Sequence, residues 1–178
     1  MSRRILALMV LLWWSGPSPA AEGPSEYQVK AAFLYKFARF IEWPATSFAD
    51  TASALVIGIL GDDPFGPMLD QAIAGKLVQG RPLQILRLDH LDQVPRCHIL
   101  FVGRQRDPKT AQILSLVGGH PVLSVGEADD FARAGGVIHL LVDDQRVFFE
   151  INTEAAQRAG LRISSQLLKL ARSTEGGR

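Results

Sequence analysis

Four short apolar runs, separated by amphipathic stretches, most limit the folds open to this chain. The runs are residues 54–60, 83–88, 98–102 and 122–125. Each run is strand-length and too continuously apolar for a strand with one face in water. Amphipathic stretches at 68–74 and 110–117 lie between some of them. Buried strands that alternate with helices predict an α/β fold, in which helices cover a mostly parallel sheet.

Both ends of the chain depart from this alternation. Residues 137–142 and 147–151 are strand-like runs separated by Asp-Asp-Gln-Arg, which predicts a C-terminal antiparallel hairpin. A helical region over 153–172 follows, and Gly160 interrupts it. Near the N-terminus, apolar residues recur every three or four positions over 27–42, which predicts a helix ended by Trp43-Pro44.

The first twenty residues have the composition of an export signal. Arg3 and Arg4 form a basic start, residues 5–14 are apolar, and Ser18-Pro19-Ala20 resembles a cleavage site. The apolar stretch is about half the roughly 20 residues that a membrane span needs. We therefore expect a signal peptide over 1–20, a flexible N-terminus over 21–25, a single domain over 26–172 and a disordered tail over 173–178.

The charge and the cysteine content of the exported chain argue against nucleic-acid binding and against internal disulfides. Removal of residues 1–20 takes away Arg3 and Arg4 and no acid, so the formal charge falls from +1 to −1. Without a clustered basic surface, nucleic-acid binding is not predicted. Cys97 is the only cysteine, so no internal disulfide can form, and its apolar surroundings favour a core residue over a reactive thiol.

Catalytic and metal motifs are incomplete in this sequence. The glycines around residues 58–66 have the wrong spacing for a dinucleotide loop, because Asp62, Asp63 and Pro64 occupy the turn. That acidic pair is typical of phospho-acceptor receivers, but no aspartate ends the third strand. The four histidines lack metal-ligand spacing, and Ser124 lacks a nucleophile elbow. We therefore predict no catalytic residues, no metal and no cofactor.

A ligand crevice is the stronger small-molecule hypothesis. Doubly wound sheets bind ligands beyond the carboxyl ends of their strands, where the strand order reverses. Candidate ligand-binding residues follow the predicted strands or open the last helix, and they are Asp62, Asp63, Phe65, Arg104, Glu127, Arg162 and Ser164. In this hypothesis Arg104 meets an anion and Phe65 stacks on a ring. The alternative is that these are ordinary loop and helix-start residues.

The first predicted helix carries more aromatic residues than a helix on a sheet usually needs. The candidate partner-binding residues on it are Phe33, Tyr35, Phe37 and Phe40. Part of so wide an apolar face is expected to contact a second subunit or another protein. The competing interpretation is that all four side chains are buried in the chain's own core.

Several motifs together resemble the YfiR family. The first is residues 26–37, EYQVKAAFLYKF, followed by Ile-Glu-Trp-Pro at 41–44. Further matches are ILGDDPFG at 59–66, GRP at 80–82, CHILFV at 97–102 and FEIN at 149–152. The series closes with AGLRISSQLL at 159–168. The resemblance covers nearly the whole mature chain and implies a Rossmann-like three-layer sandwich.

The resemblance also implies a function. Members similar to YfiR are periplasmic regulators that repress a membrane-bound YfiN-type diguanylate cyclase, which lowers cyclic di-GMP and biofilm formation. An outer-membrane YfiB-like lipoprotein relieves the repression, and the regulators dimerise. Redox control through disulfides does not transfer to a chain with Cys97 alone. A second hypothesis is a periplasmic small-molecule receptor that acts on a sensor kinase.

Overall fold

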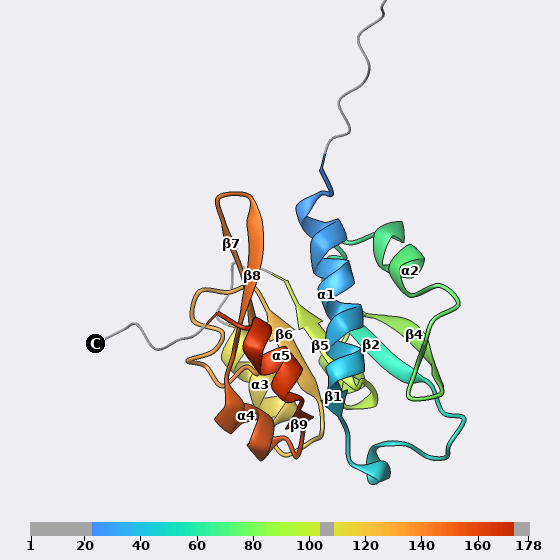
Figure 1. The fold of residues 1–178 in the computed structure, drawn as a ribbon. Helices are drawn as coiled ribbons and strands as arrows, with labels where there is room; N and C mark the ends of the chain where they lie inside the picture. The colour runs from blue at the N-terminus through green and yellow to red at the C-terminus, as the bar shows by residue number, and fades with distance from the viewer. Residues whose placement is uncertain (1–22, 104–108, 173–178) are drawn as a thin grey trace, which may run out of the picture.

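The computed structural model describes residues 23–103 and 109–172 (Figure 1). In these residues seven strands form one sheet. Their order is β3 (Leu77–Val78), β4 (Arg81–Leu88), β2 (Leu55–Leu60), β5 (Ile99–Val102), β6 (Leu123–Gly126), β7 (Ile138–Asp143) and β8 (Arg146–Ile151). The strands from β4 to β7 run parallel, and only β3 and β8 are antiparallel to their neighbours. The predicted mostly parallel sheet with a C-terminal antiparallel hairpin is confirmed.

Strand order reverses at β2, the first long strand. The chain passes from β2 to β4 on one side and then returns to β5 on the other side. Leu60, the last residue of β2, lies opposite Leu88 of β4 and Val102 of β5. The loops after β2 and β5 therefore flank a topological switch point, which is where α/β folds commonly bind ligands.

Helices cover both faces of the sheet and give it three layers. On one face lie α1 (Glu26–Phe40), α2 (Pro67–Ile73) and α5 (Ser165–Leu170), and α3 (Lys109–Val117) lies on the other (Figure 1). Alternate strand residues supply the two core layers, for example Ile57 and Ile59 to the first and Leu60 to the second. This alternation explains why the strand runs are apolar throughout.

Helix α1 is shorter than its sequence pattern predicts. Ser25 caps its start, because the Ser25 hydroxyl accepts the Gln28 N–H and the Gln28 side chain accepts the Ser25 N–H. The prediction continued the helix to Glu42, which is wrong. Residues Ile41–Glu42 form β1, which pairs antiparallel with β9 (Arg162–Ile163). Long-range strand pairing therefore overrides the helical periodicity at these two positions.

The predicted helical region over 153–172 is interrupted at Gly160 as expected, but its helical assignment is wrong at Arg162–Ile163, which form strand β9. Asn152 caps α4 (Thr153–Arg158), and Gly160 then turns the chain with a φ of 69°. A left-handed φ favours glycine at this position, because a side chain there is strained. Strand β9 and α5 follow, and the Arg172 N–H donates to the Phe149 carbonyl at 2.8 Å. The end of the described chain is thus attached to edge strand β8.

The glycine in the middle of β2 leaves room for the single cysteine. A Cβ on Gly58 would lie 2.3 Å from the Cys97 Sγ. Cys97 is 4% exposed, and burial raises the pKa of its thiol to about 11. The expectation that Cys97 is a core residue agrees with this burial.

Replacing Gly58 by alanine is expected to lower the free energy of unfolding by about 1–3 kcal/mol, because the added methyl overpacks the core. Urea denaturation measures the effect. Gly103→Ala is the matched control, since its Cβ would meet nothing closer than 3.7 Å. Equal stability of the two variants would show that the Gly58–Cys97 contact relaxes freely.

Candidate functional site

A buried ion pair joins the start of α1 to the carboxyl end of the sheet. Lys30 lies on the second turn of α1, and Glu127 directly follows β6. The Lys30 ammonium binds the carboxylates of both Glu127 and Glu26. The side chains of Lys30 and Glu127 are each only 1% exposed, whereas that of Glu26 is 43% exposed. One cation shared by two carboxylates leaves this cluster with a formal charge of −1.

Tyr27 completes the cluster. Its hydroxyl donates a long hydrogen bond of 3.5 Å to the Glu127 carboxylate, and the Lys30 Nζ lies 4.7 Å from the centre of its ring. Burial raises the pKa of the Tyr27 hydroxyl, and the negative charge of Glu127 raises it further, while Lys30 acts in the opposite direction. Tyr27 therefore remains a hydrogen-bond donor near neutral pH.

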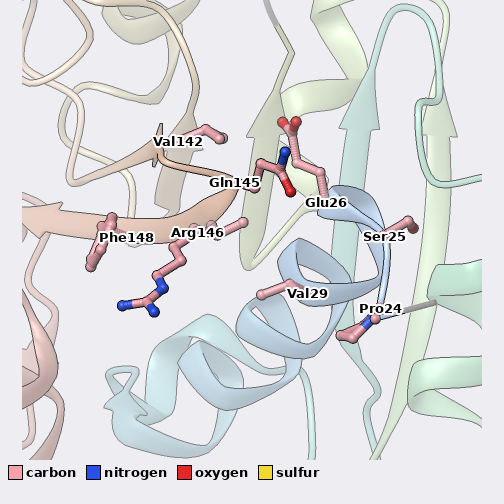
Figure 2. Close-up of a pocket in the computed structure, with 10 residues that line it drawn as sticks. Pro24, Ser25, Glu26, Val29, Val142, Gln145, Arg146 and Phe148 are labelled. Atoms are coloured by element: carbon pink, nitrogen blue, oxygen red, sulfur yellow. The ribbon is translucent and has the colours of Figure 1, made fainter. Parts of the chain in front are cut away.

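An open groove lies between the start of α1 and the β7–β8 hairpin (Figure 2). Its volume is about 840 Å³, and its walls come from residues 23–26, Val29, Val142 and residues 145–148. Val29, Val142, Val147 and Phe148 make one part of the lining apolar. Glu26 belongs to both the groove and the buried cluster, so the groove reaches the ion pair through this residue.

The hairpin that forms the second wall has a tight turn. Asp144 and Gln145 have φ angles of 47° and 61°, which is the conformation of a two-residue type I′ turn. Asp143 forms an ion pair with Arg172 at 3.5 Å, so the end of the described chain braces the hairpin. Val142 is 37% exposed and lines the groove.

The candidate residues after β2 are mostly engaged in holding their own loop. Asp62 is exposed, but Asp63 accepts the N–H groups of Phe65 and Gly66 and binds Arg87 at 2.8 Å. The expectation that Phe65 offers a ring to a ligand is wrong for this structure, because its side chain is 0% exposed. Its ring packs edge-on between Tyr27 and Phe101, so the Pro64-Phe65 turn anchors the loop in the core.

The other candidate ligand residues do not meet at the same place. Glu127 lies at the carboxyl end of the sheet, but it is buried and its two oxygens bind Lys30 and Tyr27. Arg162 and Ser164 lie beyond the C-terminal end of α1, where Arg162 pairs with Glu42 at 3.9 Å and Ser164 caps α5. Glu127 binds Lys30, which lies ten residues before the end of α1, a rise of about 15 Å, so Arg162 and Ser164 are far from Glu127. Arg104 lies outside the described residues.

The aromatic residues of α1 are mainly core residues. Phe37 is 0% exposed and packs on Phe149 with ring centres 5.1 Å apart, so its assignment to a partner surface is wrong for this structure. Phe33, Tyr35 and Phe40 are half-buried against the same core. The face is wide because α1 packs simultaneously on β8, α2 and α5. Packing within the chain therefore buries Phe37 completely and covers part of Phe33, Tyr35 and Phe40.

Sequence reasoning missed Lys30 and the groove. Lys30 falls on the helical stripe that contains Tyr27, Ala31 and Leu34. A charged residue on a buried stripe indicates a buried partner, because an unpaired buried charge is very unfavourable. The partner itself was not predictable, since Glu127 lies 97 residues further along the chain.

Within residues 23–103 and 109–172, no cluster of three or more histidine, cysteine, aspartate or glutamate side chains suits a metal ion. In the same part of the chain, no helix has the length and apolar character needed to cross a bilayer.

The chain is similar to known proteins in sequence and in fold. A family model described as YfiR/HmsC-like matches residues 27–172. A solved structure of a conserved domain protein from Vibrio cholerae O1 biovar El Tor has a TM-score of 0.51 and 12% sequence identity. That alignment covers 84% of this chain and 60% of the other chain, so this chain spans only about 60% of the length of the Vibrio protein. At such low identity the similarity concerns the fold.

Proposed function

Because the chain belongs to the YfiR/HmsC-like family, we propose that it represses a membrane-bound YfiN-type diguanylate cyclase from the periplasm. The family match over residues 27–172 carries this proposal. At the level of the family, the chain is a periplasmic regulator of cyclic di-GMP signalling. We propose that it has no catalytic activity of its own. Repression of a cyclase lowers cyclic di-GMP and, with it, biofilm formation.

The groove between α1 and the β7–β8 hairpin is the contact surface that we propose for the cyclase. Its exposed apolar wall includes Val142, and the Glu26 carboxylate at its edge belongs to a cluster with a net charge of −1. These features suit a periplasmic segment of the cyclase that inserts an apolar side chain and places a basic side chain near Glu26. Arg146 on the hairpin side then lies next to the remainder of that segment.

Repression requires only preferential binding. A regulator that binds the inactive conformation of the cyclase more tightly than the active one shifts the equilibrium by its difference in affinity. A homodimer would engage two cyclase subunits at once, which suits the two-fold symmetry common in soluble oligomers. A YfiB-like lipoprotein of the outer membrane would relieve repression by competing for the regulator.

A small-molecule receptor that acts on a sensor kinase is the second candidate function. The groove volume of about 840 Å³ favours it, because ligand pockets typically occupy 300–1,000 Å³. Unlike the predicted strand-end crevice, this groove is formed by the helix start and the hairpin. A ligand bound there would compete directly with the proposed cyclase segment.

Cyclic di-GMP measured in the native host tests the proposed function. Deletion of the gene is expected to raise cyclic di-GMP, and the exported protein, but not a form lacking residues 1–20, is expected to reverse the rise. Val142→Asp should fail to reverse it, because an acid in an apolar contact costs at least about 2 kcal/mol, or roughly thirtyfold in affinity.

Leu116→Asp is the matched control for this experiment. Leu116 is 38% exposed, like Val142, but lies on α3 on the opposite face of the sheet. Equal repression by both variants would exclude the groove while leaving the regulator intact. No change in cyclic di-GMP on deletion would instead exclude a cyclase as the target and favour the sensor kinase.

A further inference from the structure

The His98 side chain is held by hydrogen bonds at both ring nitrogens. Its Nδ1 accepts the Val56 N–H at 3.0 Å, and its Nε2 lies 3.1 Å from the Ser47 carbonyl oxygen. A carbonyl oxygen only accepts, so Nε2 carries the proton and Nδ1 is the unprotonated nitrogen. Both bonds are therefore satisfied by one form of the ring, the neutral form with its proton on Nε2.

The same ring holds a loop segment through stacking. Phe48 lies parallel to the imidazole with ring centres 4.4 Å apart, and the Arg81 guanidinium covers the other face of Phe48 at 3.7 Å. Arg81 also donates to the carbonyl oxygens of Asp50 and Ser53. Residues 45–53, which connect β1 to β2, are thus attached to the sheet mainly through His98 and Arg81.

A small cavity lies beneath this attachment. It has a volume of about 210 Å³ and is lined partly by Thr46, Ser47, Arg96, His98 and His120. In the described residues, the Ser47 hydroxyl is buried there without a hydrogen-bond partner. His98 lines this cavity, so a ring that lost its hydrogen bonds could move into it, and water entering it would satisfy the Ser47 hydroxyl.

We propose that His98 is an acid-sensitive latch, which holds residues 45–53 against the amino ends of β2 and β5 and releases them when the ring gains a second proton. An imidazolium carries N–H groups on both nitrogens, so Nδ1 can no longer accept the Val56 N–H. Two donors then face each other at about 3 Å, and the ring must leave this position to regain an acceptor.

The surrounding charges oppose protonation of His98 in the latched position. Arg81 of β4 lies behind Phe48, and Arg96 and His120 line the cavity, so the facing charged or titratable groups are positive or neutral. Cys97, the preceding residue, is a buried neutral thiol. The Asp50 carboxylate on the released segment accepts from Ser53 and Ala52, and these hydrogen bonds lower its pKa.

The direction of the pH effect follows from the folded-state pKa. Burial lowers the pKa of His98, the charge of Arg81 lowers it further, and the hydrogen bond to the Ser47 carbonyl acts in the opposite direction. A released ring has the ordinary pKa of about 6.5 and binds a proton first. The latch is therefore fully closed above about pH 6.5, and it weakens as the pH falls from there toward the folded-state value.

Amide hydrogen exchange of the mature protein tests the latch. Protection factors, which correct for the intrinsic pH dependence of exchange, are measured for Val56 near the amino end of β2 and for Ile59 near its carboxyl end. Between pH 7.5 and pH 5, the Val56 protection factor should fall, by at most about thirtyfold, because linkage of one proton gives up to tenfold per pH unit below about pH 6.5. The Ile59 protection factor should stay constant.

His98→Asn is the informative variant, because its Oδ1 can accept the Val56 N–H but does not titrate. Its Val56 protection should not change with pH, whereas His120→Asn, altered at the exposed histidine of the same cavity, should behave like the wild type. An unchanged Val56 protection factor in the wild type, or an equal fall in His98→Asn, would overturn the proposal. So would a parallel fall at Ile59, which would indicate global unfolding.

Should His98→Asn fail to fold, the ring itself provides a second test in the wild type. Nitrogen chemical shifts should show the neutral ring protonated on Nε2 and a titration midpoint below 6.5. A ring protonated on Nδ1, or a midpoint at or above 6.5, would contradict the latch.

Discussion

Lys30→Met is expected to lower the free energy of unfolding by about 3–5 kcal/mol, because it leaves the buried Glu127 carboxylate without its cation. Methionine fills a similar volume, so little of this loss would come from a cavity. The Tyr27 hydroxyl alone, at 3.5 Å, cannot replace a charged partner. Urea denaturation at neutral pH measures the change as a lower midpoint with an unchanged slope.

Glu127→Gln and the double variant separate the charge effect from packing. Glu127→Gln alone should also destabilise the protein, because it removes one of the two carboxylates that hold the buried ammonium. The double variant Lys30→Met/Glu127→Gln should recover much of the loss, since no buried charge then lacks its partner. Lys36→Met, on the exposed face of the same helix, is the control. Strictly additive losses would show that Lys30 and Glu127 act independently.

The sheet was predictable because its signal is local. A run such as residues 54–60 is apolar on both faces, which is possible only for a strand covered on both sides. The hairpin was predictable for the same reason, since the Asp-Asp-Gln-Arg turn lies directly between its strands. The helical prediction for Ile41 and Glu42 was wrong because their strand partner, β9, lies about 120 residues away and leaves no local pattern.

The candidate site was less predictable, because residue type says little about which contacts within the chain a side chain already makes. Phe65 follows a strand in a turn of acids and glycines, which is typical of an exposed loop, yet it fills the core between Tyr27 and Phe101. Glu127 was expected at the strand ends and lies there, but Lys30 neutralises it. The groove depends on the projection of the hairpin beside α1, which no motif encodes.

Phe37→Ala is expected to have the second large effect on stability. It also tests whether the aromatic face of α1 serves the core or binds a partner. Loss of a fully buried phenylalanine that packs on Phe33 and Phe149 is expected to lower the free energy of unfolding by about 3–5 kcal/mol. Thermal and urea denaturation measure this loss. Tyr35→Ala should cost less, because Tyr35 is only half-buried, even though the change also removes the contact of its ring with Lys76.

Comparing the stability of each variant with the cyclic di-GMP level in a host that carries it distinguishes the two roles of this face. If the face is core, Phe37→Ala should lose repression only in proportion to its loss of folded protein, and Tyr35→Ala should repress normally. If the face binds the cyclase, Tyr35→Ala should lose repression while its denaturation midpoint stays near that of the wild type. That second outcome would move the proposed contact from the hairpin groove to the middle of α1, because a stable protein that no longer represses has lost a contact rather than its fold.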